Sequence, residues 1–309
     1  MGPVLHSIST TAVVAEFILG NLSNGLIVLN NCIDWINKRE LSPVDQILII
    51  LAISRVTLLW ETIFIWVKTQ SISFITREEL KILVFCCILS SHFSLWLATA
   101  LSIFYLLRIA NFSWQIFLYL KWRVNQLIVG VLLGSLAFLL ANLMQMSITL
   151  EEKLNQYGRN TTVNSMERDF TLLSELILFN MTMFSVIPFS LALVSFLLLI
   201  FSLWKHLQKM QLNSRGHGDP STKAHRNAMK IIVSFLLLYA TYFLSLLIAW
   251  ISEKHRSELV HIICMITGLM YPSTHSLILI LGNSKLKQTF LLILRHLGCR
   301  LKGQNIPTT

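Results

Sequence analysis

Charged residues are scarce in this sequence. Asp, Glu, Lys and Arg together make up 13% of the 309 residues, whereas 54% of the residues are hydrophobic. An ordinary soluble domain carries about 25% charged residues, so this chain has too little polar surface to coat a water-soluble globule. A soluble fold is excluded, and a membrane protein is expected.

The short motifs of enzymes are also lacking. The chain has no HExxH, no GxSxG, no glycine-rich phosphate loop and no CxxC pair, which are patterns that carry hydrolytic, nucleotide-dependent or redox chemistry. His92 and His275 have no carboxylate or thiolate partners at metal-ligand spacing. We therefore expect neither an enzyme nor a metal site, and no cofactor.

Long apolar runs are what the sequence does contain. A helix that crosses a bilayer needs about 20 apolar residues, and the alternating pattern of a membrane barrel is absent, so the runs are expected to be helices. Residues 285–297 mix cations with Leu and Phe, which is typical of a helix on the membrane surface. The sequence predicts an all-α membrane protein, a single seven-transmembrane helix bundle over residues 1–309 with a short C-terminal surface helix at 285–297. Its spans are expected at about 8–33, 44–66, 82–107, 124–148, 172–203, 229–252 and 259–282.

The positive charge has a strongly uneven distribution over the predicted loops. The net charge is +10, but one side of the membrane receives 16 cations and four acids, whereas the other receives eight of each. Because Lys and Arg in short loops stay in the cytoplasm, the N-terminus is expected outside and the C-terminus inside. This distribution also argues against nucleic acid as a partner. Asn160-Thr161-Thr162 then lies on the outer side, between spans four and five, where Asn160 is a candidate glycosylation site.

Polar residues inside the spans are costly and therefore informative. Glu16, Gly20 and Asn24 share one face of the first span, where a glycine lets another helix approach closely. Arg55 lies near the membrane midplane and needs acceptors, for which Asn24 and the polar run 271–276 are the candidates. Two interpretations stand equal: a network that holds inactive and active helix arrangements apart, and a static structural clamp.

Proline and aromatic residues indicate where a ligand pocket would form. Pro188 and Pro272 interrupt helical hydrogen bonding, so the outer halves of spans five and seven can splay. The outer halves also carry side chains that suit an apolar pocket with a few polar groups, although packing or anchoring at the membrane interface is the alternative for each of them. These side chains are Trp66, Ser91, His92, Asn180, Phe184 and Tyr242.

Several stretches, among them Asn30–Trp35, Leu51–Arg55 and His92–Thr99, closely resemble the type 2 bitter taste receptors. The cysteine-free loop between spans four and five cannot form the disulfide of most rhodopsin-like receptors, and 104–108 stands where those receptors have Asp-Arg-Tyr. Cys299, in the basic tail, is either a palmitoylation site or an inert thiol. The stretches that carry the resemblance are Asn30–Trp35, Leu51–Arg55, His92–Thr99, Phe104–Ser113, Phe196–Leu207, Pro272–Ser276 and Leu281–Lys287.

By this resemblance the chain would be a G-protein-coupled receptor of the plasma membrane that binds small bitter compounds and activates a gustducin-type heterotrimeric G protein. The family's ligand-lining positions fall on the six side chains above, together with Cys87 and Met265. Many relatives have Trp and Glu at these last two positions, so a roomier, more apolar pocket with less preference for amines is expected.

The remaining site residues form two expected groups. The first is the activation network, which comprises Asn24, Arg55, Tyr105, Pro188, His275 and Ser276. The second contacts the G protein and comprises Arg108, Lys121, Arg123, Lys205, Lys209 and Lys287, although topology and attraction to membrane lipid are the simpler explanation for these cations. Two other functions stay open, a vomeronasal-type pheromone receptor and, with less support, a small transporter or channel.

Overall fold

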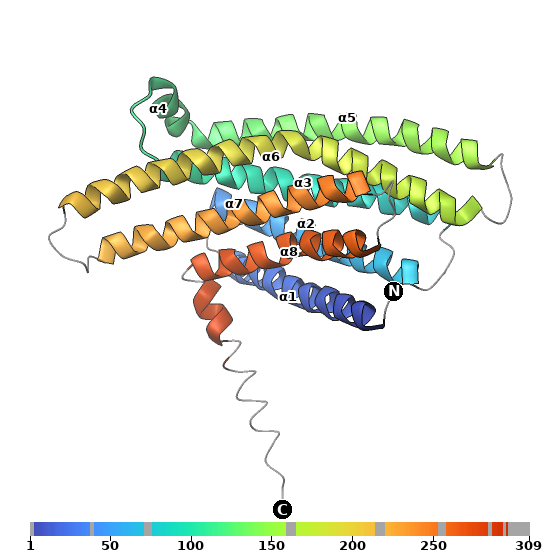
Figure 1. Cartoon of the computed structure of the whole chain (residues 1–309). Coiled ribbons are helices and arrows are strands. Elements are labelled where there is room, and N and C mark those ends of the chain that lie inside the picture. The colour runs from blue at the N-terminus through green and yellow to red at the C-terminus, as the bar shows by residue number, and fades with distance from the viewer. Residues whose placement is uncertain are drawn as a thin grey trace, which may run out of the picture.

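The fold is a bundle of helices, described here from a computed structural model that covers residues 3–37, 40–70, 76–158, 165–213, 220–252, 258–283, 286–292 and 295. No strand occurs in these residues, and 286–292 are helical after the last long helix. The helices are α1 (Pro3–Ile36), α2 (Pro43–Gln70), α3 (Arg77–Ile109), α4 (Gln115–Trp122), α5 (Val124–Gly158), α6 (Ser165–Asn213), α7 (Pro220–Ser252) and α8 (Glu258–Gly282) (Figure 1).

Seven of these helices are long and apolar enough to cross a membrane. This confirms the predicted all-α, seven-transmembrane bundle, and the chain is a multi-pass membrane protein. The exception is α4, a helix of eight residues between α3 and α5 that the sequence analysis did not predict.

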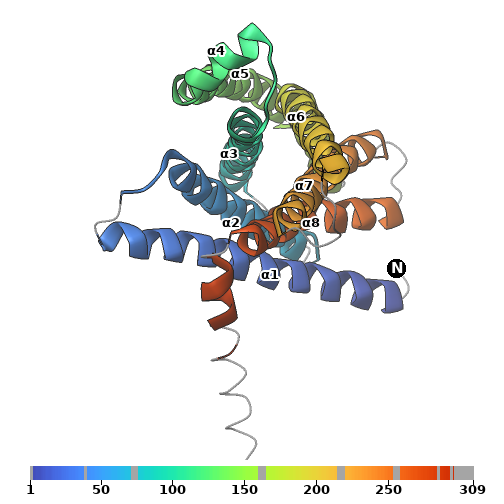
Figure 2. The same ribbon diagram turned by 90° about the vertical axis from the view of Figure 1, so that its left-hand side faces the viewer.

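Of the six other long helices, three pack against α3. α3 contacts α2, α5 and α6, whereas α8 contacts α1, α2 and α7 (Figures 1 and 2). In the most apolar window of α3, 72% of residues are buried, compared with 22% for α5. α5 is therefore a peripheral helix whose side chains mostly face outward, and α3 is the central one.

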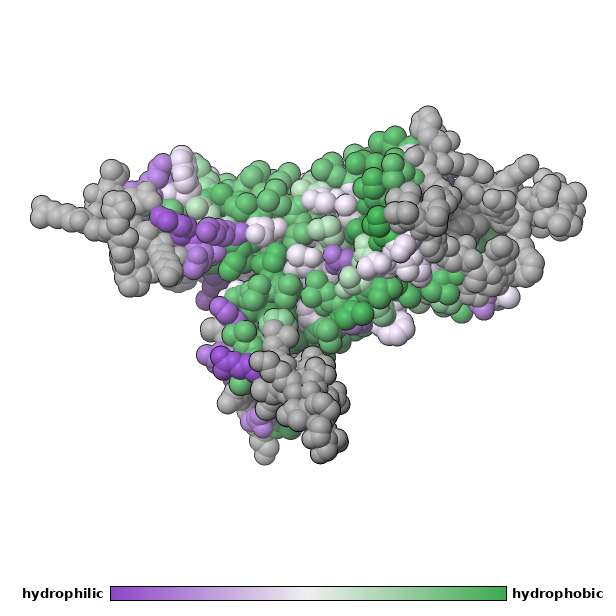
Figure 3. Space-filling view, turned by 60° about the horizontal axis from the view of Figure 1, so that its bottom comes forward, coloured by the Kyte–Doolittle hydropathy of each residue, from purple (hydrophilic) through white to green (hydrophobic). Residues whose placement is uncertain are grey.

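The two ends of the bundle differ in charge. Arg108 ends α3, and α4 and the last turns of α6 lie at the same end, where the Asn111 backbone N–H donates to Ser202 Oγ at 3.2 Å. We call this the basic end. Between the two ends the surface is largely hydrophobic, and hydrophilic residues gather toward the end on the left in Figure 3.

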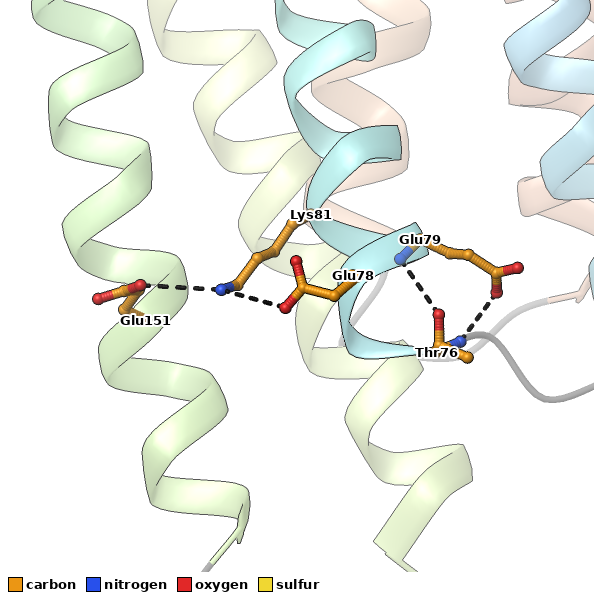
Figure 4. A network of polar contacts seen from close by, with 5 residues as sticks. All are labelled: Thr76, Glu78, Glu79, Lys81 and Glu151. Carbon is orange, nitrogen blue, oxygen red and sulfur yellow. Dashed lines mark hydrogen bonds and ion pairs between the residues drawn. The ribbon is translucent and has the colours of Figure 1, made fainter.

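At the opposite end, α3 begins with a capping box. The Glu79 backbone N–H donates to Thr76 Oγ1 at 3.2 Å, and the Thr76 N–H donates to the Glu79 carboxylate at 2.9 Å, so two donors at the helix start are satisfied. Lys81 lies 3.7 Å from Glu78 and 3.8 Å from Glu151 of α5 (Figure 4). Both acids are mostly exposed, so these ion pairs add less than about 1 kcal/mol.

The face of α1 that carries Glu16, Gly20 and Asn24 packs against α2 and α8. A Cβ at Gly20 would lie 2.5 Å from Leu59 Cδ1 and 3.2 Å from Ser273 Cβ, which means that the three helices meet closely there. Ser273 Oγ donates to the Glu16 carboxylate, and Asn24 Nδ2 donates to the Pro272 carbonyl at 3.0 Å.

Candidate functional site

Four of the predicted network residues meet in the middle of the bundle. Arg55 Nη1 lies 3.0 Å from His275 Nδ1 and donates to Ser276 Oγ at 3.0 Å. Ser276 Oγ in turn donates to Asn24 Oδ1 at 2.7 Å. Arg55, Asn24 and Ser276 are all 0% exposed. The network therefore joins α1, α2 and α8 through one buried guanidinium group.

The charge of Arg55 is held without an acid among the residues that the structure describes. Its guanidinium carbon lies 5.0 Å from the centre of the Tyr271 ring, a cation–π contact. Its Nε and Nη2 atoms are enclosed and have no hydrogen-bond partner. A buried, incompletely paired cation costs several kcal/mol, so the neutral groups around Arg55 are what keep it in place.

An aromatic layer connects this network to α7. The Tyr271 ring packs against Tyr239 at 5.5 Å and against Tyr242 at 4.8 Å between ring centres, and Phe235 stacks on His275 at 4.3 Å. Tyr242, predicted as a ligand residue, thus belongs to this layer.

Thr99 of α3 extends the connection to α6. Its Oγ1 lies 2.8 Å from the Leu95 carbonyl of its own helix, 3.0 Å from the Pro188 carbonyl and 3.4 Å from the Tyr239 hydroxyl, so the two carbonyls share its one proton. Pro188 therefore does not touch Arg55, but it is joined to it through Thr99, Tyr239 and Tyr271. Tyr105 lies farther toward the basic end and packs, half-buried, on the main hydrophobic core.

A cavity lies between α3, α5 and α6, in the half of the bundle opposite the basic end. The space inside it that a water-sized molecule can occupy is only about 20 Å³, so in this structure it is much smaller than the usual ligand pocket of about 300–1,000 Å³ and must widen to admit a larger molecule. Four predicted ligand residues line it, Ser91, His92, Asn180 and Phe184. The other lining residues are Ile88, Leu95, Trp96, Asn142, Met181, Ser185 and Pro188.

Polar atoms around this cavity are enclosed without partners. Asn180 Nδ2 donates to Asn142 Oδ1 at 2.8 Å, but Asn180 Oδ1, Trp96 Nε1 and His92 Nε2 have no hydrogen-bond partner. The exposed fractions of these three side chains are 4%, 8% and 6%. Buried polar groups are normally hydrogen-bonded, so these atoms need a partner that the chain itself does not supply.

The other four predicted ligand residues are not among the residues that line the cavity. Met265 packs with Val13, Leu59 and Leu269 in a separate apolar cluster of α1, α2 and α8. Tyr242 is in the aromatic layer, Trp66 is half-buried near the end of α2, and Cys87 is buried on α3.

A buried carboxylate lies beside Cys87. Glu61 of α2 is 8% exposed, and its Oε2 accepts a hydrogen bond from Ser90 Oγ at 2.7 Å. Ser90 Oγ also lies 3.3 Å from the Cys87 carbonyl oxygen. The hydrogen bond between Ser90 and Glu61 therefore joins α3 to α2 close to a predicted ligand position.

The predicted G-protein contacts fall into two groups at the basic end. Arg108, Lys121 and Arg123 line one hollow between α3, α4 and α5. Lys205 and Lys209 are exposed on the last turns of α6, and Lys287 is exposed in the helical segment 286–292. Asn160, the candidate glycosylation site, lies outside the described residues.

Sequence reasoning missed several residues that complete these sites. Trp96 and Asn142 both line the cavity. In the sequence, Trp96 resembles any aromatic residue of a membrane span, and Asn142 is a single polar residue in an apolar span. Thr99 and Tyr239 come together only in the folded bundle, where their side chains meet between α3 and α7. A polar residue in an apolar span indicates a side chain that faces the bundle. This signal was present in the sequence for Asn142 and Thr99.

Comparisons with known proteins agree with this architecture. The family model described as "Taste receptor protein (TAS2R)" matches residues 1–298. The chain is 74% identical over 309 residues to mouse taste receptor type 2 member 124, with all of both chains covered. It is 68% identical over 308 residues to mouse taste receptor type 2 member 102, with 99% of this chain and 93% of the relative covered.

A more distant relative extends the comparison to a primate. The chain is 56% identical over 295 residues to chimpanzee taste receptor type 2 member 13, with 95% of this chain and 97% of the relative covered. These matches favour neither a pheromone receptor nor a transporter, and they indicate a receptor rather than an enzyme. Seven membrane-spanning helices, a buried polar network and a match over nearly the whole length together show that the chain belongs to the type 2 taste receptor family, the bitter taste receptors.

Proposed function

We propose that this receptor binds small, mostly uncharged bitter compounds between α3, α5 and α6 and activates a gustducin-type heterotrimeric G protein at its basic end. The observation that carries the ligand site is the set of enclosed, unpartnered polar atoms around the cavity. The proposed orientation places the N-terminus outside the plasma membrane and the basic end in the cytoplasm, because the cations gather there.

The chemistry of the cavity favours a particular kind of ligand group. Trp96 Nε1 can only donate a hydrogen bond, and Asn180 Oδ1 can only accept one. A ligand group that does both, such as a hydroxyl or an amide, satisfies the two atoms at once. No acid is among the lining residues, so an amine would be buried without a counter-charge.

Ligand binding would reach the basic end through α6. The cavity is lined by Phe184, Ser185 and Pro188 of this helix, and the Pro188 carbonyl is bonded to Thr99, next to Tyr239 and the Arg55 network. A ligand that fits the active arrangement better than the inactive one shifts the population toward it. The α6 helix runs on to Lys205 and Lys209, which would meet the C-terminal helix of the Gα subunit.

A calcium-response screen in cells with a gustducin-type Gα subunit tests the ligand site. The chain offers two variants, Trp96→Phe, which removes the indole N–H together with part of the ring, and Asn180→Leu, which removes the amide and with it the hydrogen bond to Asn142. We expect each to raise the half-maximal concentration of hydroxyl- or amide-bearing agonists about fivefold to tenfold, the effect of one lost hydrogen bond of about 1 kcal/mol or slightly more.

Trp60→Phe is the matched control for this screen. Trp60 is 58% exposed, and its Nε1 donates to Asn21 far from the cavity, so this variant should respond like the unmodified receptor. If Trp96→Phe and Asn180→Leu reach the cell surface and respond with unchanged half-maximal concentrations, the proposed ligand site is wrong.

A further inference from the structure

The hollow at the basic end has a strongly cationic lining. Arg108, Lys121 and Arg123 line it together with Trp122, Val124, Asn125 and Gln126, and no acid is among them. Its volume is about 700 Å³, counted to include the space open to solvent. Three positive charges in one concave site repel one another, so the arrangement favours a negatively charged occupant.

The three cations contact aromatic rings and a backbone carbonyl, which are uncharged. The Arg123 guanidinium lies 5.0 Å from the centre of the Tyr119 ring, and that of Arg108 lies 5.4 Å from the Phe104 ring. Lys121 Nζ donates to the Ala110 carbonyl at 2.9 Å, at the end of α3, and has two further N–H donors. Within the described part of the chain, no acidic side chain pairs with any of these cations. Their remaining donors are available to a multivalent acceptor such as phosphate.

The helix that forms one wall of the hollow has an apolar outer surface. Its Phe117 packs into the core at 7% exposed, but Ile116, Tyr119 and Trp122 are 76%, 58% and 90% exposed. Trp114, which precedes the helix, is 60% exposed and stacks on Phe112. A short helix with apolar side chains on both faces is poorly suited to water.

The position of α4 explains this outer surface. The helix lies at the rim of the bundle, beside the basic end of the peripheral helix α5, in both views (Figures 1 and 2). Trp and Tyr are enriched at the level of the lipid headgroups, and helices with an exposed apolar face lie in that layer. At this depth the negatively charged groups next to the hollow are phospholipid phosphates.

We propose that α4 is a membrane-interface anchor and that the hollow between α3, α4 and α5 binds the phosphate of an anionic phospholipid. Arg108, Lys121 and Arg123 hold the phosphate, and Trp114, Tyr119 and Trp122 lie among the headgroups around it. The hollow shares no lining residue with the proposed ligand cavity. It lies at the end where the G protein is proposed to dock.

Native mass spectrometry of the full-length receptor from nanodiscs tests this site. The nanodiscs contain phosphatidylcholine alone or phosphatidylcholine with a minor fraction of phosphatidylserine. We expect phosphatidylserine to be retained in preference to phosphatidylcholine and to raise the midpoint of thermal unfolding. The Arg108→Gln/Arg123→Gln variant should lose about tenfold or more in apparent phosphatidylserine affinity, and Arg108→Lys/Arg123→Lys should recover most of it.

The control variant is Lys205→Gln/Lys209→Gln, which removes the same charge from exposed positions on α6. Equal loss of phosphatidylserine in both glutamine variants would mean a diffuse attraction and would overturn the proposal. Inorganic phosphate that stabilises the receptor as well as phosphatidylserine does would overturn the lipid as the source of the phosphate. If the double glutamine variant does not fold, Arg123→Gln alone is compared with Lys209→Gln, and equal retention in these two contradicts the site.

Discussion

At the residue scale, a few buried contacts decide how α1, α2 and α8 fit together. Gly20 allows a close approach that no larger residue permits, and Asn24, Arg55 and Ser276 fill the space beside it with a polar network. Sequence alone predicted the shared face of α1 and the need of Arg55 for acceptors, because polar side chains in lipid have few alternatives. The contacts of His275 with Arg55 and Phe235 could not be predicted from the sequence.

The variant Gly20→Ala should destabilise the receptor. The new Cβ would stand 2.5 Å from Leu59 Cδ1 and 3.2 Å from Ser273 Cβ, and both side chains are 0% exposed, so an overpacking cost of about 1–3 kcal/mol should exceed the gain of about 1 kcal/mol in helix propensity. The check is the thermal unfolding midpoint of the purified receptor. Gly25→Ala is the control, since a Cβ there meets nothing within 4 Å and should leave the midpoint unchanged or raised. Equal midpoints for Gly20→Ala and Gly25→Ala would contradict the close approach.

The variant Met181→Glu should gain responses to amines. Met181 lines the cavity and is half-buried, so a carboxylate there would supply the counter-charge that the lining lacks, whereas Met181→Gln adds a polar group without the charge. The measurement is a calcium-response screen against matched amine and alcohol agonists. No new amine agonist for the glutamate variant, or the same gain with glutamine, would refute the predicted preference for uncharged ligands.

At the scale of elements, α3 and α6 carry the connection between cavity and network. Thr99 joins the Pro188 carbonyl of α6 to Tyr239 of α7 by a single hydroxyl. Pro188 lines the cavity and is connected to the Arg55 network through Thr99 and Tyr239. A shift of α6 at Pro188 would therefore change the shape of the cavity and the contacts of the network.

The variant Thr99→Val keeps the shape of the side chain and removes this hydroxyl. We expect agonist concentrations for half-maximal response to rise about fivefold, which corresponds to about 1 kcal/mol of lost coupling. Thr57→Val is the control, because Thr57 is exposed and bonds only to the Ile53 carbonyl of its own helix. A normal response from Thr99→Val at normal surface expression would rule out this connection.

The elements differ in how far they could be predicted. The seven spans follow from hydrophobic runs and the absence of charge, because lipid imposes a length and a composition on each. α4 could not be predicted in this way, since it is too short to span and its aromatic residues resemble those of any loop at a membrane surface. The eight expected ligand residues divided into four at the cavity and four elsewhere, because one sequence does not specify which helix faces meet.

At the scale of the whole molecule, the bundle has a cavity, the proposed ligand site, toward one end and cations at the other. The cation count predicted the basic end, and the structure divides its cations between a hollow beside α4 and the exposed end of α6. The central claim is that binding at the cavity activates a G protein at this end.

Nucleotide exchange tests that claim most directly. The purified receptor is reconstituted in vesicles with a gustducin-type heterotrimer, and exchange on the Gα subunit is followed with an agonist from the screen. The account predicts that agonist accelerates exchange, that Trp96→Phe raises the agonist concentration required, and that Lys205→Gln/Lys209→Gln slows exchange several-fold at unchanged agonist affinity. Exchange that does not respond to agonist, or that is unaffected by both variants, would contradict it.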